Sequence, residues 1–126
     1  MLDHVSVAVR DLPGRTEEYR RVLAPLGLTL LVERPGTSGF GKAYPEFWLN
    51  ARADMAPLPS DTGIHICLRA ANEDAVRAFH AQALSSGWTD AGPPGPRQAA
   101  MTLYYAAFVQ DKDGNKLEAA NFPRKA

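Results

Sequence analysis

His4-Val5-Ser6-Val7-Ala8-Val9 opens the first strand-like segment of the chain, and His65-Ile66-Cys67-Leu68 opens a second one with the same pattern. A helix-like segment follows each of them, with Tyr19 fifteen residues after His4 and Phe79 fourteen residues after His65. A unit that recurs at this spacing is typical of a duplicated architecture. The repeat therefore predicts two modules related by a pseudo-twofold axis, each with one histidine at the same place.

The two halves are expected to share one order of elements, a strand, a helix and three further strands. In the first half the strands are expected over residues 4–9, 28–33, 39–43 and 46–50, with the helix over residues 12–26. In the second half three of the four strands are assigned, over residues 64–69, 103–110 and 115–120, with a helix over 72–86 that buries Val76, Phe79 and Leu84. Because hairpin-linked strands pair antiparallel, an all-parallel sheet is excluded.

Glycine and proline mark the expected irregular segments. Residues 53–63 are interpreted as a linker, and Gly92-Pro93-Pro94-Gly95-Pro96 as a mobile surface loop. Asp111 to Asn115 contains Asp-Gly, which predicts a tight hairpin. The resulting prediction is one α+β domain over residues 1–126, with modules at approximately 1–53 and 63–123 whose mixed sheets curl around a metal or ligand pocket.

Composition and charge exclude several classes of function. The 126 residues are 45% hydrophobic, as expected for one domain with a buried core. Lys+Arg and Asp+Glu number 14 each, so nothing favours nucleic acid or an anionic membrane as partner. No signal-peptide pattern precedes the first strand, no apolar run approaches the roughly 20 residues of a membrane span, and the single cysteine fits a reducing compartment. We expect a cytoplasmic protein.

Strand parity predicts where the polar side chains point. Successive side chains alternate across a strand, so the valines and isoleucines of the two repeats face the helices while His4 and His65 face the open side. The same alternation assigns further residues of the later strands to the open side: Glu46, Trp48, Asn50, Lys116 and Glu118. Two imidazoles and two carboxylates are therefore expected on one concave surface.

That donor set predicts a divalent metal site. Imidazole and carboxylate ligands suit Zn²⁺, Ni²⁺, Fe²⁺ or Mn²⁺. His4, His65 and Glu118 are the predicted ligands, with Glu46 as a further one, and two histidines with one carboxylate leave coordination positions open. Such an ion polarises a carbonyl or stabilises an enediolate, while Glu46 or Glu118 moves the substrate proton.

Other side chains are candidates for lining the pocket. The aromatic and small residues in question are Tyr44, Trp48, Asn50, Cys67, Tyr104 and Tyr105. Cys67 is interpreted as a small apolar residue and not as a nucleophile. His80 is expected on the helix surface. Arg69 and Lys116 are interpreted either as contacts to an anionic ligand or as solvated side chains.

The chain resembles the vicinal oxygen chelate superfamily, which includes glyoxalase I, extradiol dioxygenases and bleomycin-resistance proteins. The resemblance rests on Leu2-Asp3-His4-Val5, on Gly63-Ile64-His65-Ile66, and on the stretch from Phe108-Val109 through Asp111-Lys112-Asp113-Gly114 to Glu118. It implies paired βαβββ modules and a homodimer, with sites that are sometimes built across the interface. It also implies metal ligands at His4, His65 and Glu118, and it aligns Glu46 with the fourth ligand and catalytic carboxylate of glyoxalase I.

Three functions follow from the resemblance. The first is a metal-dependent, glyoxalase-like lyase or isomerase that acts on a small oxygenated substrate through a metal-bound enediolate. The second is an extradiol-type dioxygenase with Fe²⁺, and the third is a metal-free binding protein of the bleomycin-resistance type. The complete ligand set favours a metal-dependent enzyme similar to small bacterial glyoxalase-like proteins. The arginine and asparagine cluster that binds glutathione carboxylates in glyoxalase I is not identified in this chain.

Overall fold

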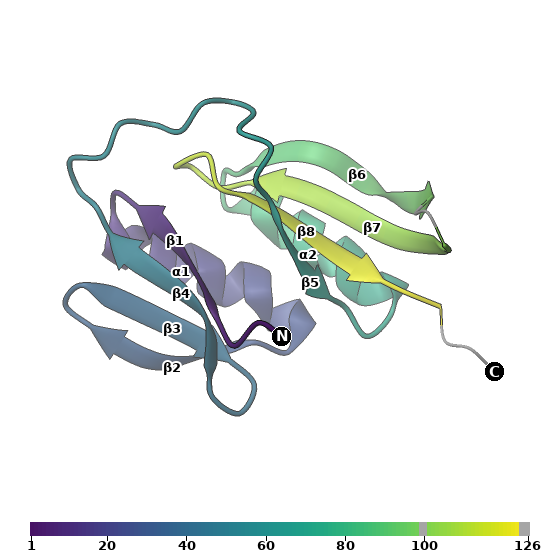
Figure 1. Ribbon diagram of the computed structural model, residues 1–126, viewed down its shortest axis with the longest axis horizontal. Coiled ribbons are helices and arrows are strands. Elements are labelled where there is room, and N and C mark those ends of the chain that lie inside the picture. The colour runs from purple at the N-terminus through teal and green to yellow at the C-terminus, as the bar shows by residue number, and fades with distance from the viewer. Residues whose placement is uncertain (99–100, 124–126) are drawn as a thin grey trace.

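Two four-stranded sheets lie next to each other in the computed structural model, which describes residues 1–98 and 101–123 (Figure 1). The elements of the first module are β1 (Val5–Val9), α1 (Leu12–Leu23), a short 3-10 helix η1 (Ala24–Leu26), β2 (Thr29–Arg34), β3 (Thr37–Gly41) and β4 (Pro45–Ala51). Those of the second are β5 (Ile66–Arg69), α2 (Glu73–Ser85), β6 (Thr89–Gln98), β7 (Leu103–Gln110) and β8 (Lys116–Asn121). The α+β class and the order of elements in each half are confirmed.

The two sheets share one topology. Their strand orders are β1-β4-β3-β2 and β5-β8-β7-β6, and the first strand of each module is parallel to the last. The other neighbours in both sheets are antiparallel. A parallel pair needs a long crossover, which the helix and the two intervening strands provide. The first and last strands of each module are therefore neighbours, so their side chains can form a common site.

Both helices contribute to one hydrophobic core. The side chains of Tyr19 and Phe79, one from each helix, are fully buried, and they pack in the same cluster as Phe47, Val109 and Leu117 of the strands. Further strand residues pack against this cluster from the same side: Val5, Val7, Ile66 and Leu68. The predicted strand parity is thus confirmed, and no helix of the described residues covers the opposite face of either sheet. The sheets do not close around a pocket.

Residues 92–96 belong to a strand, so the prediction of a mobile loop was wrong. They lie within β6, which pairs with β7 through two register shifts, between Asp90 and Gly92 and between Gly92 and Gly95. Proline is tolerated at such irregular positions of an edge strand, where a missing N–H leaves no partner unpaired. Proline therefore argues against a central strand at residues 92–96, but not against an outer one.

The buried face of α2 also differs from the prediction. Leu84 is 42% exposed, whereas His80 is only 9% exposed. The buried positions of α2 are Val76, Phe79, His80 and Ala83, the i, i+3, i+4, i+7 spacing of one helix face. The imidazole Nε2 of His80 lies 2.9 Å from Oδ1 of Asp90. This polar partner makes the burial of His80 possible. The predictions of an exposed His80 and a buried Leu84 were therefore both wrong, because His80 lies on the buried face of the helix and Leu84 does not.

A polar network connects α1 to the second module. Tyr19 donates its hydroxyl to Oδ2 of Asp111 at 2.6 Å, and Glu18 accepts from Nε1 of Trp88 and from Nζ of Lys112, each at 2.7 Å. The two modules are therefore joined by specific charged contacts as well as by the shared core.

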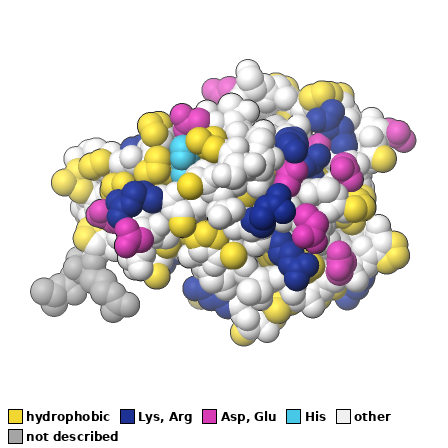
Figure 2. Space-filling model, turned by 180° about the vertical axis from the view of Figure 1, so that it is seen from behind, with side chains coloured by type: hydrophobic (Ala, Val, Ile, Leu, Met, Phe, Trp, Pro, Cys, Tyr) yellow, Lys and Arg dark blue, Asp and Glu magenta, His cyan; other side chains and the backbone are white. Residues whose placement is uncertain are grey.

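Charged side chains of both signs are interspersed on the back of the molecule (Figure 2). No helix in residues 1–98 and 101–123 is long and apolar enough to cross a bilayer.

Candidate functional site

His65 and Glu118 form a contact on the open face of the second sheet. β5 and β8 are parallel neighbours, with Cys67 paired to Glu118, and His65 directly precedes β5. The imidazole Nε2 of His65 lies 3.0 Å from Oε1 of Glu118. The Glu118 side chain is only 4% exposed, and that of His65 is 41% exposed. A buried carboxylate and a half-exposed imidazole are thus positioned together by the backbone.

The second oxygen of this carboxylate has no hydrogen-bond partner among the described residues. Glu118 Oε2 is buried and makes no hydrogen bond of normal length with a described residue, while the Cys67 thiol and the Tyr104 hydroxyl lie near the carboxylate. A buried polar atom without a partner is costly, and such atoms in native structures commonly indicate an ion or a functional role. An imidazole nitrogen and a free carboxylate oxygen are ligands for a borderline divalent cation. These residues therefore fit the predicted metal.

Glu118 also affects the ionisation of its neighbours. Burial, and then the negative charge of Glu118, raises the pKa of the Cys67 thiol to about 12. Burial and the same charge raise the pKa of Tyr104. Both groups are therefore neutral at physiological pH, which agrees with the interpretation of Cys67 as a non-nucleophilic residue.

The Cys67 thiol is expected to react slowly with a disulfide reagent at pH 8, although the residue is exposed. Its thiolate is the reactive form and is scarce well below a pKa of about 12. The rate of thiol release with 5,5′-dithiobis(2-nitrobenzoate) measures this directly. Removing the Glu118 charge with Glu118→Gln is expected to increase the rate, whereas a rate equal to that of free cysteine in the wild type would contradict this assignment.

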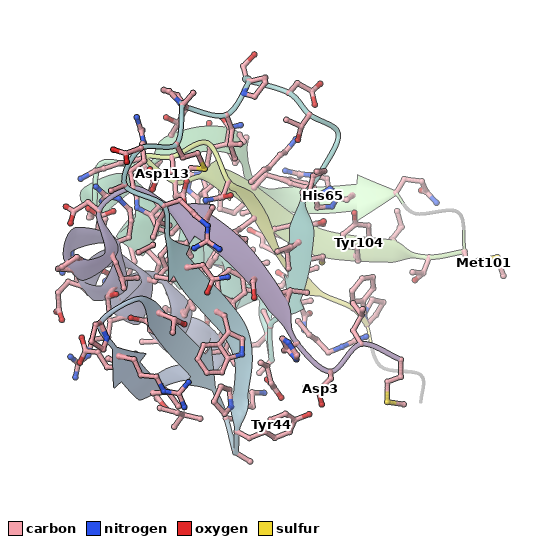
Figure 3. All side chains as sticks on the ribbon, turned by 60° about the vertical axis from the view of Figure 1, so that its left-hand side comes forward. Asp3, Tyr44, His65, Met101, Tyr104 and Asp113 are labelled. Carbon is pink, nitrogen blue, oxygen red and sulfur yellow. The ribbon has the colours of Figure 1, made fainter. Side chains whose placement is uncertain are left out.

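His4 is not grouped with the other two predicted ligands. Its Nδ1 lies 2.8 Å from Oδ1 of Asp3, and its side chain is 54% exposed. Asp3 and Tyr44 lie together near the starts of β1 and β4, away from His65 and Tyr104 on the second sheet (Figure 3). Among the described residues, no three His, Cys, Asp or Glu side chains are grouped to hold a metal ion. One copy of the chain thus brings together two of the three predicted ligands.

The strand registers show which residue of the first module corresponds to Glu118. Ser6 pairs with Trp48 in β1 and β4, as Cys67 pairs with Glu118 in β5 and β8. Trp48 therefore occupies the position equivalent to Glu118, and Glu46 lies two residues earlier on the same face. Both side chains are half-buried, as is that of Asn50. The guanidinium carbon of Arg34 lies 5.9 Å from the Trp48 ring centroid.

Two neighbouring tyrosines point to opposite faces of β7. Tyr105 packs against the core and accepts a hydrogen bond from Nη1 of Arg77 in α2 at 3.1 Å, so it lies on the helix side. Tyr104 lies on the open face, close enough for Glu118 to affect its pKa. Phe108, which the sequence reasoning did not single out, contacts His65 with ring centroids 5.5 Å apart. Its place four residues after Tyr104, on the same face of the strand expected over residues 103–110, was the signal that could have identified it.

A separate cavity of about 860 Å³ lies between η1 and the start of α2. Lys42, Arg69 and Phe122 are among its lining residues, and His65 and Glu118 are not. The cavity therefore adjoins the open face at Arg69 without containing the His65–Glu118 pair.

Comparisons with known proteins agree with this architecture. The family model of the Glyoxalase/Bleomycin resistance protein/Dioxygenase superfamily matches residues 1–119. A solved glyoxalase/bleomycin resistance protein from Albidiferax ferrireducens T118 is 29% identical with a TM-score of 0.85, over 96% of this chain and 98% of that chain. No match was found among curated protein sequences.

Two more distant structures share the fold. One is the genomically encoded fosfomycin resistance protein FosX from Listeria monocytogenes, 16% identical with a TM-score of 0.70 over 98% of this chain and 93% of that chain. The other is a glyoxalase/bleomycin resistance protein/dioxygenase family enzyme from Burkholderia phytofirmans PsJN, also 16% identical with a TM-score of 0.70, over 96% of this chain and 98% of that chain.

Proposed function

Because the chain belongs to the glyoxalase/bleomycin resistance protein/dioxygenase superfamily, we propose that it is a metal-dependent lyase or isomerase that acts on a small oxygenated substrate. The observation that carries this proposal is the His65–Glu118 contact of 3.0 Å, in which one carboxylate oxygen is buried without a partner among the described residues. These nitrogen and oxygen donors suit Mn²⁺, Fe²⁺, Ni²⁺ or Zn²⁺. His65 and Glu118 are then two ligands of the ion.

The third ligand in this proposal is His4 of a second copy of the chain. His4 is half-exposed on the first sheet, whereas His65 and Glu118 lie on the second. Neither open face is covered by a helix, and the sheets do not close on each other within one chain. A twofold dimer that places the first sheet of one copy over the second sheet of the other covers both faces, and its symmetry creates two equivalent sites.

The chain's own residues supply ligation and proton transfer. When bound, the ion polarises a substrate oxygen and favours loss of a proton from the neighbouring carbon. In this proposal Glu46, the half-buried carboxylate of the first sheet's open face, takes up that proton. Trp48 occupies the position equivalent to Glu118, so the first sheet provides no carboxylate ligand at that position. With three protein ligands, coordination positions of the ion remain open for substrate.

A second candidate is a dioxygenase. Two histidines and one carboxylate with open positions are the ligand set of non-haem Fe²⁺ oxygenases, and the presence of Trp48 in place of a fourth ligand favours it. Oxygen consumption with catechols identifies this activity, and turnover of methylglyoxal–thiol adducts identifies the glyoxalase activity. Each assay is carried out on protein loaded with Fe²⁺, Ni²⁺ or Zn²⁺ in turn.

Mixing two inactive variants tests the shared site. His4→Ala and His65→Ala are each expected to lose bound Mn²⁺, measured by metal analysis after equilibrium dialysis. When the two are unfolded together and refolded, a mixed dimer contains one intact site. Random assortment makes half of the dimers mixed, so about one quarter of the wild-type Mn²⁺ content returns.

Two other outcomes of the mixing experiment would contradict the proposal. If neither variant loses Mn²⁺, the ligand assignment is wrong. If both lose it and mixing restores none, the three ligands do not come from two copies. Arg20→Gln, an exposed change on α1, is the control for the refolding procedure and retains full Mn²⁺ content alone and in mixtures.

A further inference from the structure

The open face of the second sheet is organised in rows of paired residues. Directly opposed residues on neighbouring strands share a face, and the registers of β5, β8, β7 and β6 define three rows. From the far end to the metal end they contain Arg97, Tyr104 and Phe122; Gly95, Ala106, Ala120 and Arg69; and Gly92, Phe108, Glu118 and Cys67. Apart from Arg69, the side chains of the middle row are small, and Ala106 and Ala120 are fully buried.

Aromatic rings support the cations of this face. The guanidinium carbon of Arg69 lies 5.0 Å from the Phe122 ring centroid, and that of Arg97 lies 5.9 Å from the Phe108 centroid. Lys116 Nζ lies 5.2 Å from the same Phe108 ring. A guanidinium that stacks on a ring uses its flat face and leaves its N–H edges available. The rings therefore support both guanidinium groups. Arg69 has no hydrogen-bond partner among the described residues, and Arg97 donates from Nη1 and Nη2 to two carbonyl oxygens and keeps its other N–H groups for an oxyacid.

These cations are not neutralised by the protein. Within residues 1–98 and 101–123, Arg69 and Lys116 form no ion pair or hydrogen bond, and no carboxylate pairs with Arg97. Arg97 donates instead to the carbonyl oxygens of Pro93, at 2.6 Å, and Pro96, at 3.2 Å. The carboxylate in these rows is Glu118, which is 3% exposed and has one unpartnered oxygen. Three cations and one buried carboxylate thus share this face.

We propose that this face binds a small organic anion, with its carboxylate or phosphonate group held between Arg97 and Arg69 and its reacting end directed to His65 and Glu118. β5 and β6 are three strand spacings apart, about 14 Å, and the two guanidinium groups lie near the rings of Phe122, directly after β8, and Phe108, in β7. Planar guanidinium groups bind both kinds of oxyacid through paired N–H donors. The inference rests on the proposed function and specifies its substrate class.

Titration of the full chain with simple anions tests the inference. Methylphosphonate and acetate are added separately to ¹⁵N-labelled protein without added metal, with acetamide as the neutral analogue of acetate. At least one anion is expected to shift the amide signals of Ala106 and Ala120 saturably, and acetamide is not. Binding of methylphosphonate alone, acetate alone or both supports the proposal and identifies the acid group.

Matched variants assign the binding to the arginines. Arg97→Gln and Arg69→Gln are each expected to weaken anion binding about tenfold, because a charge-assisted pair is lost. Arg97→Lys keeps the charge and is expected to retain more affinity than Arg97→Gln. Arg20→Gln removes an equal charge from the exposed surface of α1 and is expected to change nothing. Should Arg97→Gln fail to fold, Arg97→Lys and Arg69→Gln still decide the question.

The outcomes separate this inference from the proposed function. Absence of saturable shifts with both anions overturns the inference, as does equal weakening by Arg20→Gln and Arg97→Gln. Neither result affects the Mn²⁺ content measured with His65→Ala. Conversely, wild-type Mn²⁺ content in His65→Ala overturns the metal site, whether or not the arginines bind anions.

Discussion

Glu118→Gln is expected to weaken Mn²⁺ binding at least about 100-fold, because it removes a charged ligand and not merely a supporting contact. The same substitution is expected to stabilise the metal-free protein by about 1 kcal/mol, since a neutral amide replaces a buried carboxylate with an unpartnered oxygen. Equilibrium dialysis with Mn²⁺ and urea unfolding in the presence of a chelator measure the two effects. Weaker Mn²⁺ binding together with a more stable metal-free protein indicates that Glu118 serves metal binding and lowers the stability of the fold.

A merely structural Glu118 predicts a different result. If its role were to hold His65 in place, Glu118→Gln would keep the hydrogen bond to Nε2 and leave both quantities nearly unchanged. A large loss of stability in the metal-free protein would likewise contradict the assignment, because it would mean that the carboxylate is satisfied in the fold.

Glu18→Gln is expected to lower the free energy of unfolding by about 2 kcal/mol at pH 7, because this buried carboxylate has three donors, of which Trp88 and Arg15 are themselves largely buried. Glu18 accepts from Trp88 and Lys112 and forms an ion pair with Arg15. Burial opposes ionisation of Glu18, but these hydrogen bonds from Arg15, Lys112 and Trp88 outweigh it and lower its pKa below the usual 4.5. The glutamine keeps the oxygen that accepts from Trp88 and loses the charge.

The pH dependence has a definite sign. A carboxylate with a lowered pKa in the folded state contributes stability that is present above pH 4.5 and is lost as the pH falls towards its folded value. The difference between wild type and Glu18→Gln is therefore expected to shrink below pH 4.5, as measured by urea unfolding across pH 3 to 7. Glu17→Gln is the matched control, since Glu17 is exposed on the same helix turn and, in the part of the chain that the structure describes, pairs only with Arg20, at 3.4 Å. An equal effect of both substitutions would show that the network adds no stability.

The repeat and strand parity predicted most of the fold because both follow from local periodicity. The alternation of His4 to Val9 and of His65 to Leu68 fixed which side of each sheet faces the helices, and the core confirms it. The Asp-Gly pair likewise predicted a tight turn, in which Gly114 adopts a positive φ of 96° that is suited to glycine. The strand nature of residues 92–96 depends on pairing with β7, which no local pattern encodes.

The candidate site was predictable only in part, for a different reason. Parity places a residue on a face but does not give the register between strands, so Glu46 and Glu118 appeared equivalent although Trp48 holds the corresponding position. Parity also cannot show which faces of two modules meet. His4 and His65 occupy equivalent positions of the repeat, each on the open face of its sheet. Among the described residues of one chain they do not form a metal-binding group with Glu118.

The prolines of β6 have a consequence for how copies of this chain associate. β6 is the outermost strand of its sheet, and Pro93, Pro94 and Pro96 have no N–H with which to bond another strand. An outer strand of this kind resists the edge-to-edge growth that leads to fibrils. Association through that side of the molecule is thereby directed away from continuous sheets.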